Sequence, residues 1–139
     1  MKILLDAMGG DNAPDANIQG AINAVNKVKA EIILIGKEEV IRNKVKEFTG
    51  KEIEQVSDRL KIKNATEEIE MCDIPTVAIK HKKDSSMVVG FKMLKEGEGD
   101  VFISAGNSGA LLTGATLLVG RIKGIDRPAL AGILPAYKS

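Results

Sequence analysis

The alternation of short apolar runs with segments of helical periodicity is the feature that most constrains the fold of this 139-residue chain. Short apolar runs bounded by glycine or polar residues are typical of buried strands. Strands separated by helices pair in parallel and carry helices on both faces. We therefore predict an α/β fold with an open, doubly wound, mainly parallel sheet in three layers. The predicted strands are Lys2–Asp6, Glu31–Ile35, Leu60–Lys63, Asp100–Ile103 and Ala129–Leu134.

Apolar residues recur every three or four positions between these strands and predict the helices. The first helix begins at Pro14, whose fixed φ suits a first helical position. The stretch Asn64–Asp84 follows no clear period and is predicted to be irregular. The predicted helices are Pro14 to about Lys29, Glu38–Phe48, a helix from Ser85 or Ser86 to Gly97, and Asn107–Ile122, with a further helical turn in Glu52–Asp58.

The composition excludes several classes of protein. A net charge of +1 does not suggest a nucleic-acid-binding surface. Only 3% of the residues are aromatic and none is tryptophan, which argues against a surface that stacks on bases or sugars. The single cysteine, Cys72, cannot form an internal disulfide, which fits a reducing cytoplasm. One cysteine and one histidine do not predict a zinc site. No segment approaches the roughly 20 apolar residues of a membrane span.

The end of the chain predicts that more polypeptide follows. Ala129–Leu134 has the composition of an inner strand, yet only four residues follow Pro135. A domain rarely ends directly after a buried strand without a closing helix. We therefore expect residues 1–139 to form a single α/β domain that is the N-terminal portion of a longer protein.

The segment Val101–Leu112 carries the clearest functional signal, because a predicted strand runs into a loop of small residues and then into a helix. The first N–H groups of a helix lack internal partners and can bind an anion. Glycines let a phosphate group approach the backbone closely. The same pattern also fits an ordinary helix start with Asn107 or Ser108 as the N-cap, and the usual dinucleotide and P-loop spacings are absent. The loop residues that carry this signal are Ser104, Gly106, Asn107, Ser108 and Gly109.

The loop after the first predicted strand is a second candidate. Gly9 and Gly10 allow close backbone approach to a ligand. Asp6 and Asp11 would repel a bare phosphate, but they could order the loop, hold a basic side chain or orient the proton of a nucleophile. A purely structural reading is open as well, in which Asp6 binds loop N–H groups and Asp11 or Asn12 caps the following helix.

The third candidate lies just before the third predicted helix. Lys80, Lys82 and Lys83 beside Ser85 and Ser86 would make an anion-binding surface. A charged loop exposed to water is the alternative. The only histidine, His81, lies within this run and is predicted to be exposed rather than to act as a general base.

Arg127 could bind a carboxylate or phosphate through two parallel hydrogen bonds, or could pair with Asp126 or with another group of the protein surface. In open α/β sheets, ligands bind outside the carboxyl ends of the strands. The three segments Asp6–Pro14, Asn64–Ser86 and Ser104–Ser108 are all predicted to lie there. Their convergence favours a phosphate site over three unrelated turns.

These residues resemble one family, the bacterial phosphate acyltransferases of phospholipid synthesis, in its N-terminal part. The resemblance implies transfer of a long-chain acyl group from acyl carrier protein to inorganic phosphate, without a metal or redox cofactor. It also implies a cytoplasmic homodimer loosely associated with the membrane surface, and a fold similar to phosphotransacetylases and isocitrate-type dehydrogenases. The four matching blocks are Asp6–Asp11, Asp73–Met87, Ser104–Ala110 and Gly124–Leu130.

The resemblance and the loop chemistry together predict the site. Small departures from the family pattern are Ser108 in place of threonine, Lys80 in place of arginine and Asn64 in place of histidine. The residues predicted to take part in catalysis are Asp6, Asp11, Lys83 and Asn107, and those predicted to bind phosphate are Gly9, Gly10, Ser85, Ser86, Ser104, Gly106, Ser108, Gly109 and Arg127.

Two other functions stay open from the sequence. One is a phosphotransacetylase-like acyltransferase that uses coenzyme A. The other is a non-catalytic α/β module that binds phosphate. An isocitrate-type dehydrogenase is disfavoured, because the chain has no cluster of metal-binding aspartates.

Overall fold

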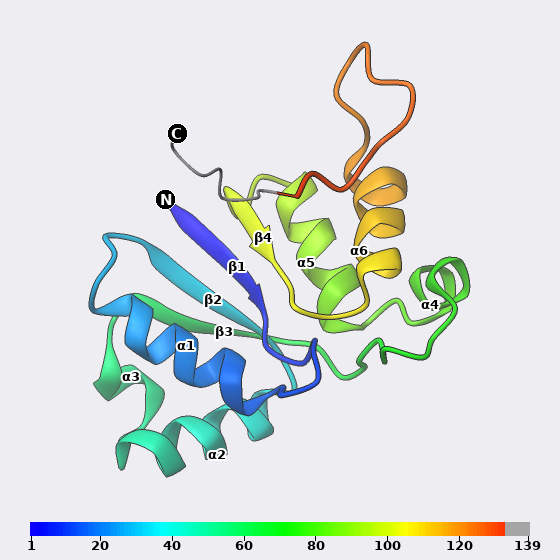
Figure 1. Cartoon of the computed structure of the whole chain (residues 1–139). Helices are drawn as coiled ribbons and strands as arrows, with labels where there is room; N and C mark the ends of the chain where they lie inside the picture. The colour runs from blue at the N-terminus through cyan, green and yellow to red at the C-terminus, as the bar shows by residue number, and fades with distance from the viewer. Residues whose placement is uncertain (133–139) are drawn as a thin grey trace, which may run out of the picture.

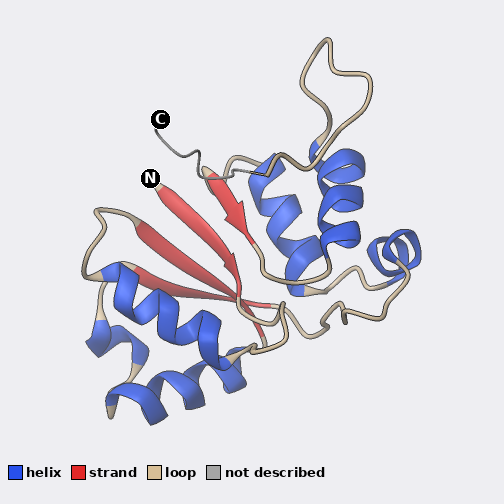
Figure 2. Ribbon diagram, viewed as in Figure 1, coloured by secondary structure: helices blue, strands red, loops and turns tan. Residues whose placement is uncertain are grey.

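The computed structural model describes residues 1–132 and contains a four-stranded parallel sheet with helices on both faces (Figures 1 and 2). The order across the sheet is β3-β2-β1-β4. The strands are β1 Lys2–Asp6, β2 Glu31–Gly36, β3 Leu60–Asn64 and β4 Val101–Ile103. The helices are α1 Asp15–Val25, α2 Glu38–Thr49, α3 Ile53–Val56, α4 Pro75–His81, α5 Ser86–Lys95 and α6 Ser108–Gly114, which continues as the π-helical turn η1 Ala115–Val119. The predicted α/β fold is confirmed.

The two central strands are covered on both faces, which explains their continuous apolar runs. In β1, Leu4 pairs with Ile33 of β2 on one side and with Phe102 of β4 on the other. Strand β4 lies at the edge of the sheet, and its Val101 and Ile103 are 37% and 48% exposed.

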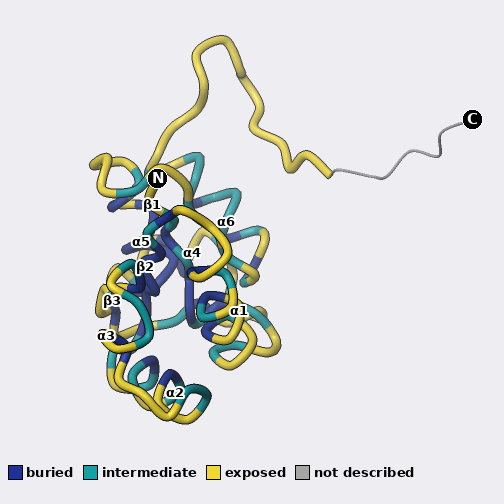
Figure 3. The backbone as a smooth tube through the Cα atoms, turned by 90° about the vertical axis from the view of Figure 1, so that its left-hand side faces the viewer, coloured by how far each residue is buried: buried dark blue, intermediate teal, exposed yellow. Residues whose placement is uncertain are grey.

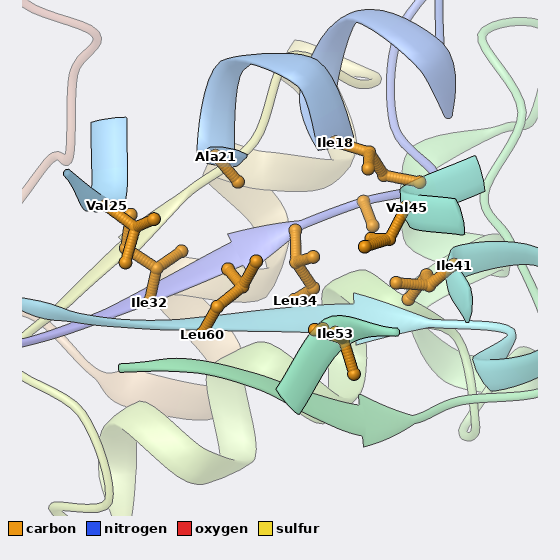
Figure 4. Packing of buried hydrophobic residues seen from close by; sticks show 10 residues of the cluster. Ile18, Ala21, Val25, Ile32, Leu34, Ile41, Val45, Ile53 and Leu60 are labelled. Carbon is orange, nitrogen blue, oxygen red and sulfur yellow. The ribbon is translucent and has the colours of Figure 1, made fainter. Parts of the chain in front are cut away.

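One face of the sheet is covered by α1, α2 and α3 (Figure 4). Alternate residues of the strands point to this face, because side chains of a strand alternate between its two sides. The fully buried residues of this cluster are all aliphatic, as the composition predicts. The labelled side chains in Figure 4 are Ile18, Ala21 and Val25 of α1, Ile32 and Leu34 of β2, Ile41 and Val45 of α2, Ile53 of α3 and Leu60 of β3.

Helix α5 covers the opposite face, where its Val89 and Met93 pack with Leu4, Ile33 and Ile35 of the strands. The helix lies very close to β4 at Gly90. A Cβ added to Gly90 would lie 2.3 Å from the ring of Phe102. Helix α6 packs on α5, and α4 packs mainly on α6, so α4 lies at the outside of this side of the sheet (Figure 1).

The structure corrects four details of the predicted elements. Helix α1 ends at Val25 rather than near Lys29, because the guanidinium of Arg59 donates hydrogen bonds to the carbonyls of Val25 and Val28 at this helix end. The helical segment after Asn107 ends at Val119 rather than at Ile122. The next residue, Gly120, has a φ of 107°, which does not continue a helix.

The third and fourth corrections concern whole elements. Residues 75–81, predicted to be irregular, form α4 with Pro75 in the first helical turn. Residues 129–132, predicted to begin a fifth strand, pair with no strand among residues 1–132 and are exposed, like the whole segment 121–132 (Figure 3). Ile133 and Leu134 of that predicted strand lie outside the described residues. Of the helices in the described part of the chain, none is long and apolar enough to cross a membrane.

Candidate active site

The carboxyl ends of β1 and β4 lie side by side, and a buried carboxylate joins the loops that follow them. Asp6 ends β1 and is 1% exposed. Its Oδ2 accepts a hydrogen bond from the Ser104 hydroxyl at 2.7 Å, and its Oδ1 accepts one from the N–H of Met8 at 3.1 Å. The Ser104 oxygen in turn accepts the N–H of Gly106 at 3.1 Å. These bonds fix the first loop and the loop after β4 relative to each other.

Glycines allow these two loops to touch through their backbones. A Cβ added to Gly9 would lie 2.4 Å from Oδ2 of Asp6, and one added to Gly106 would lie 3.2 Å from the Cα of Gly9. Gly10 has a φ of 117°, a conformation that side chains rarely adopt. The predicted glycines therefore leave the backbone of both loops close together at one edge of the sheet.

Asn17 of α1, which sequence reasoning missed, holds the first loop through hydrogen bonds to its carbonyls. Its Nδ2 donates to the carbonyls of Asp6, Ala7 and Gly9, at 3.2, 3.3 and 2.8 Å. Buried carbonyls need such partners, and a loop that turns sharply cannot supply them itself. Nothing in the local sequence pattern distinguishes Asn17 from other polar residues of the helix.

Asn107 connects the loop after β4 to the segment before α4. Asn107 is the N-cap of α6, one of the two predicted alternatives, and its Oδ1 accepts the N–H of Ala110 at 3.0 Å. Its Nδ2 donates to the carbonyls of Glu70, Met71 and Asp73, at 3.3, 3.2 and 3.0 Å. The donors of this amide are therefore engaged within the protein. Asn107 positions the 70–73 segment against α6.

The N-terminus of α5 completes this edge of the sheet. Ser85 is the N-cap of α5, one of the two predicted alternatives. Its hydroxyl oxygen accepts the N–H of Val88, and its O–H donates to the carbonyl of Lys82 at 2.7 Å. Ser86 is 1% exposed. A Cβ added to Gly106 would lie 3.4 Å from the terminal methyl of Met87, so the start of α5 adjoins the loop after β4.

The three lysines of the basic run have different surroundings. Lys82 donates to Asp73 at 2.6 Å and to the carbonyl of Glu68 at 3.0 Å. This pairing raises the pKa of Lys82, and the hydrogen bond from Lys82 lowers the pKa of Asp73. Lys80 and Lys83 are exposed and form no ion pair with any carboxylate of residues 1–132.

Asp84 binds Thr66, at the start of the segment 66–73 that Lys82 and Asn107 also contact. Its Oδ2 accepts hydrogen bonds from both the N–H and the hydroxyl of Thr66. These bonds lower the pKa of Asp84, because they stabilise the ionised form. Together with Lys82 and Asn107, Asp84 fastens the 66–73 segment to this edge. The predicted convergence of three segments at the carboxyl ends of the strands is confirmed.

The remaining four predicted site residues have different surroundings. Asp11 is exposed in the turn before α1, and Ser108 is exposed at the start of α6. Gly109 packs on α4, since a Cβ there would lie 2.7 Å from Cγ of Pro75. Arg127 lies on the exposed segment that leaves the opposite end of α6 and η1, so the structure does not bring it to the other residues (Figures 1 and 3).

The donors left uncommitted at this edge are suited to a compact anion. Within the described residues, the hydroxyls of Ser86 and Ser108 and the ammonium of Lys83 make no side-chain hydrogen bond. Hydrogen bonds from charged or hydroxyl donors to phosphate oxygens are among the stronger protein interactions. Asp6, by contrast, already accepts two hydrogen bonds and is buried, which suits it to holding the loops in place.

Comparison with known proteins agrees with the resemblance seen in the sequence. The model of the family described as fatty acid synthesis protein matches residues 1–139. A phosphate acyltransferase of Acetivibrio thermocellus is 56% identical over 136 residues, which are 97% of this chain and 39% of that protein. A phosphate acyltransferase of Clostridioides difficile is 49% identical over 138 residues, which are 99% of this chain and 39% of that protein.

A third relative, the phosphate acyltransferase of Thermoanaerobacter pseudethanolicus, is 51% identical over 136 residues, or 97% of this chain and 38% of that protein. The chain thus spans about two fifths of the length of these curated relatives. The match covers all four blocks on which the resemblance rests. The chain therefore belongs to the fatty acid synthesis protein family.

Proposed function

We propose that the complete protein containing this chain transfers a long-chain acyl group from acyl carrier protein to inorganic phosphate, giving acyl phosphate for phospholipid synthesis. The observation that carries the proposal is the hydrogen bond between Asp6 and Ser104, which locks two glycine-bearing loops together beside the start of α5. The relatives named phosphate acyltransferase support the same reaction class.

The chemistry needs no acyl-enzyme intermediate, because phosphate is itself the nucleophile. A phosphate oxygen attacks the thioester carbonyl, an oxyanion forms, and the bond to sulfur breaks as the thiolate leaves. The site must hold phosphate in place without neutralising the attacking oxygen, and the positioning lowers the barrier by making the attack effectively intramolecular. Lys83, Ser86 and Ser108 are the proposed phosphate donors. Asp6 and Asn107 are proposed to position the loops that carry them.

The phosphate dependence of the complete protein tests these assignments. Lys83→Met removes a charged donor and is expected to raise the KM for phosphate on the order of tenfold or more. Ser108→Ala removes a neutral hydroxyl and is expected to raise it about fivefold. Lys95→Met, on the last turn of α5, is the matched control and should leave that KM unchanged. Phosphate saturation like that of the unmodified protein in both variants would contradict the proposed site.

The acyl donor is tested separately with two thioesters. Acyl phosphate formation from acyl carrier protein but not from acyl coenzyme A supports the proposed donor. Formation from acyl coenzyme A alone replaces it with a phosphotransacetylase-like reaction. Calorimetric phosphate binding without turnover of either thioester would indicate a non-catalytic module instead.

We further propose that residues 1–139 are the N-terminal portion of the complete enzyme, because the curated relatives are about two and a half times as long. The complete enzyme is proposed to be a cytoplasmic homodimer that associates loosely with membranes. Light scattering of the purified complete protein, and its sedimentation with phospholipid vesicles, test these two points. A monomeric mass or the absence of any vesicle-bound fraction would contradict the respective point.

A further inference from the structure

A groove of about 580 Å³ lies between α4, α5 and η1. Ile79 and Val88, which are 5% and 1% exposed, form its buried apolar base. Leu118 is half-buried, and Leu117 at the side of the groove is 66% exposed. We call this feature the α4–α5 groove. Its full lining is Thr76, Ile79, Lys80, Lys83, Val88, Lys92, Leu117 and Leu118.

Lys80, Lys83 and Lys92 surround the α4–α5 groove, and none of them forms an ion pair within the described residues. The carboxylate of Asp84 does act on Lys92, whose positive charge helps to lower the pKa of Asp84. The ammonium of Lys92 donates only to the carbonyl of Lys83, at 3.1 Å. Elsewhere on the surface, lysines such as Lys44 and Lys46 are paired with glutamate or aspartate. The groove therefore combines an apolar lining with a local excess of positive charge.

This combination is complementary to the apolar face of an acidic amphipathic helix. In helix-in-groove recognition, apolar side chains at helical spacing enter the groove while the flanking charges set orientation and partner choice. A flat membrane surface cannot follow a concave groove between helices. A single phosphate group would use one of the lysines and leave the apolar lining exposed.

We propose that the α4–α5 groove docks an acidic helical face of the carrier protein that delivers the acyl group, an inference that rests on the proposed function. The groove adjoins the candidate site, because Lys83 lines it and lies two residues before the N-cap Ser85. Its other wall, α4, contacts the start of α6 through Pro75 and Gly109. A carrier seated here places its thioester arm beside the loops that are proposed to hold phosphate.

Direct binding of holo-acyl carrier protein, without an acyl group, to the complete protein tests the docking surface. Lys92→Glu and Leu117→Gln change the charge and the apolar wall of the groove, and each is expected to weaken binding about three- to fivefold. Lys95→Glu and Val119→Gln are the matched controls, because both residues are exposed and outside the groove. Raising the salt concentration should weaken the binding of the unmodified protein more than that of Lys92→Glu.

Equal carrier binding by all four variants and the unmodified protein would overturn the docking surface. So would a Leu117→Gln variant that lowers the melting temperature of the complete protein and leaves carrier binding unchanged, since the rest of the polypeptide would then cover the groove. Failure of the proposed function gives a different result. In that case the unmodified protein forms no acyl phosphate from acyl carrier protein, whatever the binding data for the variants.

Discussion

The Ser104 hydroxyl donates a hydrogen bond to Oδ2 of Asp6 at 2.7 Å, between residues that are 98 positions apart in the chain. The bond is possible because β1 and β4 are neighbours in the sheet and run parallel, so both residues emerge at the same edge. It joins two loops that the sequence predicts as separate anion-binding candidates. The relationship makes the geometry of each loop depend on the other.

Removal of this hydroxyl should destabilise the protein. Ser104→Ala leaves the buried Asp6 carboxylate without one of its two donors, and we expect the free energy of unfolding to fall by about 1–3 kcal/mol. Ser108→Ala, an exposed hydroxyl four residues later, should change it by less than about 0.5 kcal/mol. Urea unfolding of the complete protein measures both. An equal effect of the two substitutions would show that the Asp6–Ser104 bond does not stabilise the fold.

Gly9 and Gly20 form a second matched pair. Gly9→Ala would place a Cβ 2.4 Å from Asp6 Oδ2, so we expect a loss of about 1–3 kcal/mol in the free energy of unfolding. A Cβ at Gly20 in α1 meets nothing within 4 Å, and Gly20→Ala should therefore stabilise the protein by about 0.5–1 kcal/mol. Melting temperatures of the two variants should shift in opposite directions. A Gly9→Ala variant as stable as the unmodified protein would mean that the two loops can separate.

Elements specified by local patterns could be predicted from the sequence. The four strands of the described part, α2 and the caps Ser85 and Asn107 each depend on residues next to one another in the chain. Helix α4 was missed because it is only seven residues long and lies in a charged stretch without a clear period, although Pro75 is a typical helix-start signal. The predicted strand from Ala129 was wrong for residues 129–132, since a strand also needs a neighbour, which composition does not supply.

The roles of single side chains in the site depend on contacts distant in the sequence. Asn107 binds carbonyls 34 to 37 residues away, so its sequence neighbours identify the cap but not the second role. Lys82 has the same sequence surroundings as Lys80 and Lys83. Only the fold separates the lysine paired with Asp73 from the two exposed ones. Local pattern therefore predicts where the site lies but not which donors are free.

The second role of Asn107 can be separated from the first by substitution with aspartate. Asn107→Asp keeps an oxygen that can accept the N–H of Ala110, but it loses the donors and places a charge against three carbonyls. We expect the free energy of unfolding to fall by about 1–3 kcal/mol and amide exchange in the 70–73 segment to accelerate. Asn43→Asp, at an exposed position of α2, is the control. Unchanged exchange in that segment would contradict the positioning role.

The Lys82–Asp73 pair predicts how stability depends on pH. The pKa of Asp73 lies below its ordinary value of 3.8, so its contribution is present above that value and is lost as pH falls through the lowered pKa. The pKa of Lys82 lies above its ordinary value of 10.5, so its contribution is present below that value and is lost as pH rises through the raised pKa. Between these limits the pair contributes a constant amount.

Lys82→Met should remove the pH dependence that the Lys82–Asp73 pair gives to the free energy of unfolding, at both its acid and its alkaline limit. We therefore expect the difference in unfolding free energy between the unmodified protein and Lys82→Met to be constant from about pH 5 to 9, because both groups are charged there. The difference should shrink below about pH 4, where Asp73 takes up a proton. Lys80→Met, which removes an exposed lysine that forms no ion pair within residues 1–132, should show no such acid dependence. Urea unfolding at a series of pH values measures all three proteins, and parallel curves for the two variants would contradict the pairing.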